Sequence, residues 1–86
     1  MKKILKFYSP TCGPCKVMGK TLSSLEGVDI EEIDITDDAN ESLLEKWNIR
    51  TIPTVIVLDE NDELVKEFKG VVSMDKINEA LNDTEI

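Results

Sequence analysis

The sequence contains two cysteines, Cys12 and Cys15, which are separated only by Gly13 and Pro14. This tetrapeptide, which follows the short apolar run Ile4–Tyr8, constrains the fold more than any other stretch. If Cys12 caps the start of a helix and Cys15 lies in its first turn, the two sulfurs fall on one side, close enough to bond. Pro14 is compatible with a first turn because the N–H that it lacks would have no helical partner there.

A helix that begins at Cys12 would also favour chemistry at its sulfur. The free backbone N–H groups and the positive end of the helix dipole would stabilise a thiolate on Cys12. A thiolate beside a second thiol can carry out disulfide exchange, in which the first sulfur attacks and the second resolves the mixed disulfide. We therefore predict that Cys12 is the attacking sulfur and that Cys15 is the buried resolving sulfur.

Two other interpretations of the cysteine pair are weaker. A purely structural disulfide would close so small a loop that it would constrain the unfolded chain little. A closed zinc site needs four nitrogen or sulfur ligands, whereas the chain offers two cysteines and no histidine. The pair is therefore interpreted as redox-active.

Composition limits the partners that we expect. The 86 residues suffice for one domain with a single core, here residues 1–86 with a frayed tail at 83–86. The net charge of −8 argues against a nucleic-acid backbone as partner. The apolar start of the chain is interrupted at Lys6 and is too short for a signal peptide or a membrane span. We expect a cytoplasmic monomer that binds neither nucleic acid nor membrane.

The apolar pattern predicts elements in the order strand, helix, strand, helix, strand, strand, helix. The predicted strands cover residues 3–8, 28–35, 54–58 and 63–69, and the predicted helices begin near Cys12, Asp38 and Ser73. The first strand, helix and strand require a right-handed crossover and parallel pairing, whereas the later hairpin is antiparallel. The predicted fold is therefore α/β, with a four-stranded mixed sheet and helices on both faces.

Two local patterns give finer predictions. Asp38 and Glu41 have the spacing of a capping box, which predicts that they open the second helix. Alternation in the last strand predicts that Leu64 and Phe68 share one side.

Three features of the sequence resemble the thioredoxin family. They are the run Cys12–Lys16 after a strand, the run Ile49–Thr54 before the central strand, and Gly70 after the hairpin. The resemblance implies a thioredoxin fold, βαβαββα, without the strand and helix that ordinary thioredoxins carry at the N-terminus. It also implies that Pro53 follows a cis peptide bond beside the cysteines. There, the backbone of Ile52 would pair with an extended substrate segment.

The resemblance also assigns substrate binding to Gly13, Pro14, Ile52, Pro53, Gly70 and Val71, and a supporting role to Lys6, Tyr8 and Glu32. Two surface positions depart from the family pattern. Thr11 replaces the tryptophan that normally precedes the first cysteine, and so removes a large flat contact. Lys20 stands where the family helix has a kinking proline.

Lys6 and Glu32 also depart from the family pattern. Lys6 stands where the family usually buries an aspartate, and Glu32 stands where the lysine partner of that aspartate usually lies. If the second strand has no bulge, Glu32 points to the same face as Ile30. Because a buried charge needs a partner, we expect a charge-reversed pair, whose cation would ease thiolate formation on Cys15. The alternative is that Lys6 places its ammonium in water.

The expected function is the reduction of protein disulfides. More oxidising relatives usually carry a histidine between the cysteines, and Gly13 and Pro14 provide no such cation. No metal, nucleotide or prosthetic group is implied, because the dithiol itself carries the electrons. The resemblance suggests that disulfide-containing proteins are the substrates and that a flavin-dependent thioredoxin reductase recycles the protein.

Two alternatives remain open from the sequence. A glutaredoxin-like protein would be recycled by glutathione, although such proteins often have paired glycines after the hairpin, whereas Val71 and Val72 follow Gly70 here. A binding module with an incidental cysteine pair would instead dock partners through the surface around Pro14 and Pro53.

Overall fold

The computed structural model describes residues 2–82, in which the predicted order of strands and helices is found. The strands are β1 (Lys2–Tyr8), β2 (Val28–Asp34), β3 (Thr54–Leu58) and β4 (Leu64–Lys69); the helices are α1 (Gly13–Ser23), the 3₁₀ helix η1 (Asp38–Asn40), α2 (Glu41–Lys46) and α3 (Met74–Asn82). No helix within these residues has the length and apolar character that a membrane crossing requires. The predicted frayed tail, 83–86, lies outside the described residues.

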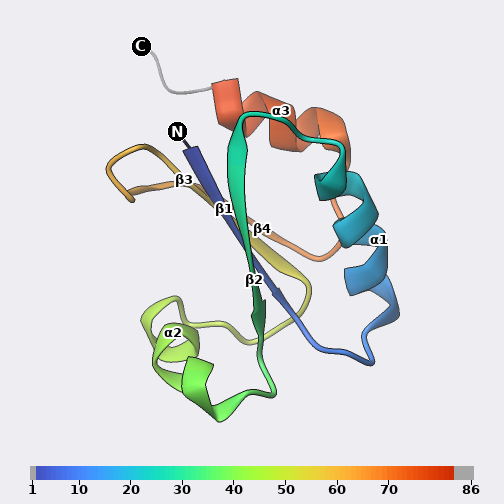
Figure 1. Ribbon diagram of the computed structural model, residues 1–86, viewed down its shortest axis with the longest axis vertical. Coiled ribbons are helices and arrows are strands. Elements are labelled where there is room, and N and C mark those ends of the chain that lie inside the picture. Colours follow the sequence, from blue (N-terminus) through green and yellow to red (C-terminus); the bar gives the residue numbers. More distant parts are fainter. Residues whose placement is uncertain (1, 83–86) are drawn as a thin grey trace.

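The four strands form one mixed sheet in the order β2-β1-β3-β4. β1 is parallel to β2 and antiparallel to β3, and β3 is antiparallel to β4. Helices α1 and α3 cover one face of the sheet, and the short helix α2 covers the other (Figure 1). The predicted α/β architecture, with helices on both faces, is therefore confirmed.

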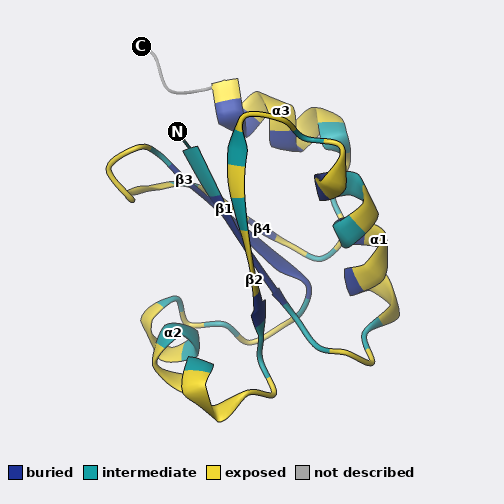
Figure 2. Cartoon of the chain, in the orientation of Figure 1, coloured by how far each residue is buried: buried dark blue, intermediate teal, exposed yellow. Residues whose placement is uncertain are grey.

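Two apolar clusters, one on each face, hold the helices against the sheet. Successive side chains of β1 and β3 alternate between the two clusters because side chains in a strand point to opposite faces. The first cluster contains Ile4, Met18, Leu22, Val55, Val57, Phe68, Ile77, Ala80 and Leu81, and the second contains Leu5, Phe7, Ile33, Ile56 and Leu58. All residues of β3 are buried, as predicted for a central strand (Figure 2).

Strand β2 contacts both apolar clusters and has no bulge. It pairs with β1 without a register shift, so that Glu32 lies opposite Lys6. Ile30 packs against the first cluster and Ile33 belongs to the second. The slip in its apolar pattern therefore reflects contact with both cores, and Glu32 faces the same side as Ile30.

Strand β4 differs from the prediction in the placement of Leu64. The register of its pairing with β3 shifts near one end, which leaves Val65 as an extra residue in the ladder. Val65 packs against the first cluster together with Phe68, whereas Leu64 is 54% exposed. The prediction that Leu64 and Phe68 share one side was wrong, because a bulge breaks the alternation of side chains.

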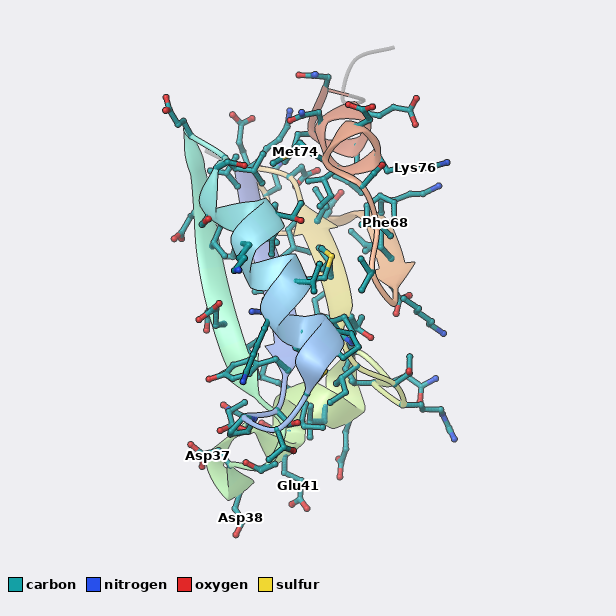
Figure 3. All side chains as sticks on the ribbon, turned by 90° about the vertical axis from the view of Figure 1, so that its right-hand side faces the viewer. Asp37, Asp38, Glu41, Phe68, Met74 and Lys76 are labelled. Carbon is teal, nitrogen blue, oxygen red and sulfur yellow. A yellow bond between two sulfur atoms is a disulfide. The ribbon has the colours of Figure 1, made fainter. Side chains whose placement is uncertain are left out.

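The start of α2 also differs from the prediction. The side chain of Asp37 accepts a hydrogen bond from the N–H of Ala39 and thereby caps η1, and α2 begins only at Glu41. Asp38 and Glu41 do not form the predicted capping box, because the chain makes a 3₁₀ turn before the α-helix. Asp37, Asp38 and Glu41 all point away from the sheet at this end of the molecule (Figure 3).

The bulge predicts that two truncations in β4 have different costs. Phe68→Ala should lower the free energy of unfolding by about 3–5 kcal/mol, the usual range for a buried phenylalanine. Leu64→Ala should change it by less than about 0.5 kcal/mol, because the side chain is exposed and contributes little to the core. Urea denaturation measures both values, and equal losses would contradict the bulged register.

Candidate active site

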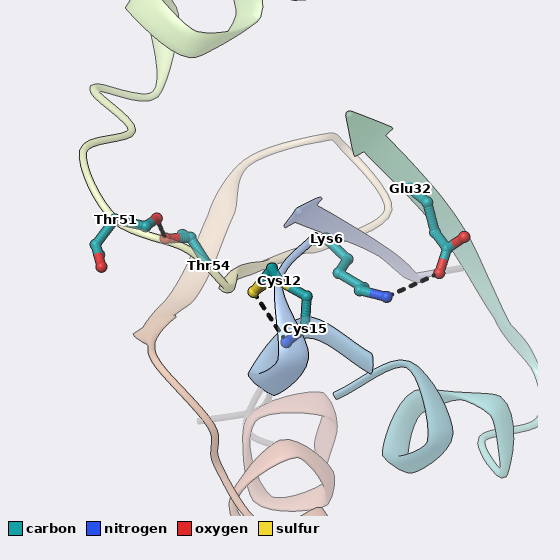
Figure 4. Close-up of a disulfide and its surroundings, with 6 residues drawn as sticks. All are labelled: Lys6, Cys12, Cys15, Glu32, Thr51 and Thr54. Carbon is teal, nitrogen blue, oxygen red and sulfur yellow. Dashed lines mark hydrogen bonds and ion pairs between the residues drawn. A yellow bond between two sulfur atoms is a disulfide. The ribbon is translucent and has the colours of Figure 1, made fainter. Parts of the chain in front are cut away.

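The two cysteines lie where β1 leads into α1. Cys12 is the N-cap residue of α1, and its Sγ accepts a hydrogen bond from the backbone N–H of Cys15 at 3.1 Å (Figure 4). The cysteines form a disulfide, with their Cα atoms 5.2 Å apart. Pro14 occupies the first turn of the helix, as predicted. The start of α1 therefore holds both sulfurs on one side and directs the N–H of Cys15 at the sulfur of Cys12.

The two sulfurs differ in their access to solvent. Cys12 is half-buried, whereas Cys15 is 1% exposed because it lies on the inner face of α1. The first turn of α1 has no acidic residue to oppose a negative charge. In the reduced state, Cys12 is therefore the sulfur that a second molecule can reach, and the helix N-terminus favours its thiolate.

The loop before β3 lies next to the chain that leads to the cysteines, because Thr54 pairs with Phe7 in the sheet. The peptide bond between Ile52 and Pro53 is cis, as the sequence resemblance implied. The hydroxyl of Thr54 donates a hydrogen bond to the carbonyl oxygen of Thr51 at 2.6 Å and holds the loop against the start of β3.

A second loop closes this end of the sheet. The N–H of Gly70 donates a hydrogen bond to the carbonyl oxygen of Pro53 at 2.8 Å. Gly70 has a φ of +86°, which glycine adopts without steric cost, and Val71 follows it with 52% of its surface exposed. The predicted substrate-binding residues of three separate segments are thus brought together around the cysteines.

Ile52 lies in the loop that leads into β3, directly before Pro53. Its side chain is half-buried, and it lies outside the ladders of β3. Within residues 2–82, no backbone–backbone hydrogen bond outside the helices and strands uses Ile52. The pairing of this backbone with an extended substrate segment, which the resemblance implied, stays a prediction.

The predicted pair of Lys6 and Glu32 is present. Lys6 is 5% exposed, and its Nζ lies 3.0 Å from Oε2 of Glu32 (Figure 4). The same Nζ lies 5.1 Å from the ring centroid of Tyr8, so all three predicted supporting residues meet. The alternative, with the ammonium of Lys6 in water, is wrong because Glu32 stands beside it in the parallel register of β1 and β2.

Two contacts of α1 were not predicted. A Cβ atom on Gly19 would lie 2.9 Å from Nζ of Lys6, so the ammonium occupies space that any other residue would fill. The N–H of Val72 donates to Sδ of Met18 at 3.3 Å and ties the second loop to the helix. The first contact had one signal in the sequence. A glycine inside a helix lowers the stability of the helix, so Gly19 indicated a close approach of another group.

Comparison with known proteins identifies the chain's relatives. A family model described as Thioredoxin matches residues 1–83. Thioredoxin of Bacillus subtilis is 30% identical over 79 residues, which cover 88% of this chain and 75% of that protein. A protein disulfide-isomerase of Datisca glomerata is 30% identical over 82 residues, which cover 86% of this chain but only 16% of the larger protein. The solved structure of the germline-specific thioredoxin Deadhead from Drosophila melanogaster is 28% identical; it superimposes with a TM-score of 0.79, covering 98% of this chain and 81% of that one.

The difference in access between the two sulfurs predicts which single variant accumulates an adduct. Cys15→Ser should trap a mixed disulfide between Cys12 and a disulfide-containing peptide, because the resolving sulfur is absent. Cys12→Ser should trap far less, because Cys15 is buried. Mass spectrometry after digestion identifies the bonded cysteine.

Timed alkylation of the reduced wild-type protein checks the same assignment without a mutation. Cys12 should be labelled first at neutral pH. Labelling of Cys15 before Cys12 would reverse the roles.

Proposed function

The chain belongs to the thioredoxin family of thiol–disulfide oxidoreductases, and we propose that it works as a reductant of protein disulfides. The observation that carries this proposal is the placement of one accessible and one buried sulfur at the start of α1. Cys12 has the access and the helix N-terminus that an attacking thiolate requires. Cys15 is close enough to Cys12 to complete the reaction but is shielded from competing substrates.

The proposed cycle transfers two electrons to the substrate. The thiolate of Cys12 attacks one sulfur of a substrate disulfide, so that a mixed disulfide forms and the first substrate sulfur leaves as a thiolate. Cys15 then loses its proton and attacks Cys12. The Cys12–Cys15 disulfide forms, and the second substrate sulfur leaves. The substrate disulfide is reduced, and the protein is left oxidised.

The loops around the cysteines support a protein rather than a small molecule as the substrate. We propose that an extended substrate segment pairs with the free backbone groups of Ile52, as an added strand does at a sheet edge. Gly13 and Pro14 would border this segment on one side, and the exposed side chain of Val71 would border it on the other. The backbone contacts would hold the substrate disulfide in front of Cys12.

The oxidised pair must be reduced again by another molecule. We propose a flavin-dependent thioredoxin reductase for this step, on the basis of family membership, and the cytoplasm as the reducing compartment. No bound cofactor is needed in the proposed cycle, because the sulfurs of Cys12 and Cys15 carry the electrons. Recycling by glutathione is the competing outcome, and it can be tested directly.

An electron-source assay tests the proposal. Reduction of a disulfide-containing protein such as insulin should be rapid with NADPH and a thioredoxin reductase, and at least about tenfold slower with glutathione and glutathione reductase. The assay measures NADPH consumption and precipitation of the reduced test protein. The variant with both Cys12→Ser and Cys15→Ser should be inactive with either source.

The outcomes separate the candidate functions. Faster turnover with glutathione would replace the proposed electron source and indicate a glutaredoxin-like protein. A double variant that still binds partners, together with a wild-type protein inactive with both sources, would indicate a binding module.

A further inference from the structure

Lys6 is the one charged residue that is buried among residues 2–82. Moving an ammonium out of water is costly unless a charge or a hydrogen bond compensates for the lost solvation. The proposed cycle does not use Lys6, although the residue lies two positions before the end of β1, the strand that leads to the loop before Cys12. The groups that surround the ammonium of Lys6 therefore indicate the role of this residue.

Three elements surround the ammonium of Lys6. Glu32 on β2 places Oε2 at 3.0 Å, and the ring of Tyr8 on β1 lies 5.1 Å away. On α1, Gly19 leaves the ammonium room to approach the helix, because a Cβ there would lie 2.9 Å from Nζ. The charge is thus held between the sheet and the inner face of the helix that carries both cysteines.

This position lies about one helical turn from Cys15. Gly19 follows Cys15 by four residues, and Cβ positions with that spacing are about 5–6 Å apart on the same face of a helix. Cys15 is 1% exposed, so little water screens the interaction between its sulfur and the ammonium. Glu32 is 54% exposed and lies on the far side of the ammonium from Cys15 in the view of Figure 4.

We infer that Lys6 raises the reduction potential of the Cys12–Cys15 couple and that Glu32 partly offsets this effect. Reduction of the neutral disulfide takes up two electrons and one proton and gives one thiolate and one thiol. The neighbouring sulfurs of the reduced pair share this negative charge through the proton between them, and the Lys6 cation stabilises the part that falls on Cys15. It has no comparable interaction with the neutral disulfide, so it favours the reduced state. Glu32 neutralises part of the cation and limits that preference.

The inference rests on the proposed dithiol–disulfide cycle, but its test needs no protein substrate. Wild-type protein and variants are equilibrated in glutathione redox buffers, and the ratio of dithiol to disulfide is measured by alkylation and mass spectrometry. Lys6→Met should move the equilibrium toward the disulfide by about tenfold, which corresponds to about 30 mV for a two-electron couple. Glu32→Gln should move it toward the dithiol by about threefold.

The opposite signs distinguish an electrostatic effect from a structural one. If the pair only held β1 to β2, both variants would lower the stability of the fold and neither would shift the redox equilibrium in a direction set by charge. Glu32 is half exposed, so Glu32→Gln should still fold and still test the sign if Lys6→Met does not fold.

The chain offers a matched control on the same two strands. Lys3 and Glu31 form an ion pair at 3.6 Å, with side chains that are 32% and 52% exposed. Lys3 lies on the face of β1 that carries Leu5, which faces away from α1. Lys3→Met and Glu31→Gln should therefore leave the redox equilibrium within about twofold of the wild-type value.

Two results would overturn the inference. The first is a ratio of dithiol to disulfide that Lys6→Met and Glu32→Gln shift in the same direction. The second is a redox equilibrium that Lys6→Met and Glu32→Gln each shift by no more than the Lys3 and Glu31 control variants do. A wild-type pair that does not cycle between dithiol and disulfide would overturn the proposed function as well, whereas a cycling pair that the variants leave unmoved would overturn only the inference.

Discussion

The hydrogen bond from the N–H of Cys15 to Sγ of Cys12 is the interaction on which the site depends. It makes a sulfur the cap of a helix, so one otherwise unpaired N–H of the first turn, that of Cys15, is directed at the reacting atom. Met18 and Leu22 hold the same helix on the sheet, and this packing buries Cys15 while Cys12 stays within reach. The packing of one amphipathic helix thus makes Cys12 accessible and Cys15 buried, although the two side chains are chemically identical.

The sheet topology assembles the rest of the site. β1 ends, β3 begins and β4 ends at the same edge, because β3 is antiparallel to both of its neighbours. The hydrogen bond between Gly70 and Pro53 and the contact between Val72 and Met18 join the two loops to each other and to α1. The site therefore depends on strand order as much as on the cysteine motif, since the motif alone provides no surface to hold a substrate.

The sequence predicted the features that depend on alternation or on a specific motif. The cysteine pair and the buried central strand follow from spacing and from the apolar run. The pair of Lys6 and Glu32 was expected from the family resemblance, and the parallel register of β1 and β2 brings it together. The bulge at Val65 was missed because an inserted residue changes which side chains share a face without changing the composition of the strand. The cap at Asp37 was missed because two adjacent aspartates are equally able to cap a helix, and only the 3₁₀ turn distinguishes them. The close approach of Gly19 to Lys6 depends on how α1 sits on the sheet, which local pattern does not determine.

The assembly of the site from three segments can be tested with a structure of the protein covalently bound to a substrate peptide. In a complex formed by the Cys15→Ser variant, we predict a bond between Cys12 and the peptide cysteine. We also predict hydrogen bonds between the peptide backbone and both backbone groups of Ile52, with the peptide running between Pro14 and Val71. A peptide that is bonded to Cys12 but leaves Ile52 unpaired, or that lies away from Val71, would contradict the assembly of the site from these three segments.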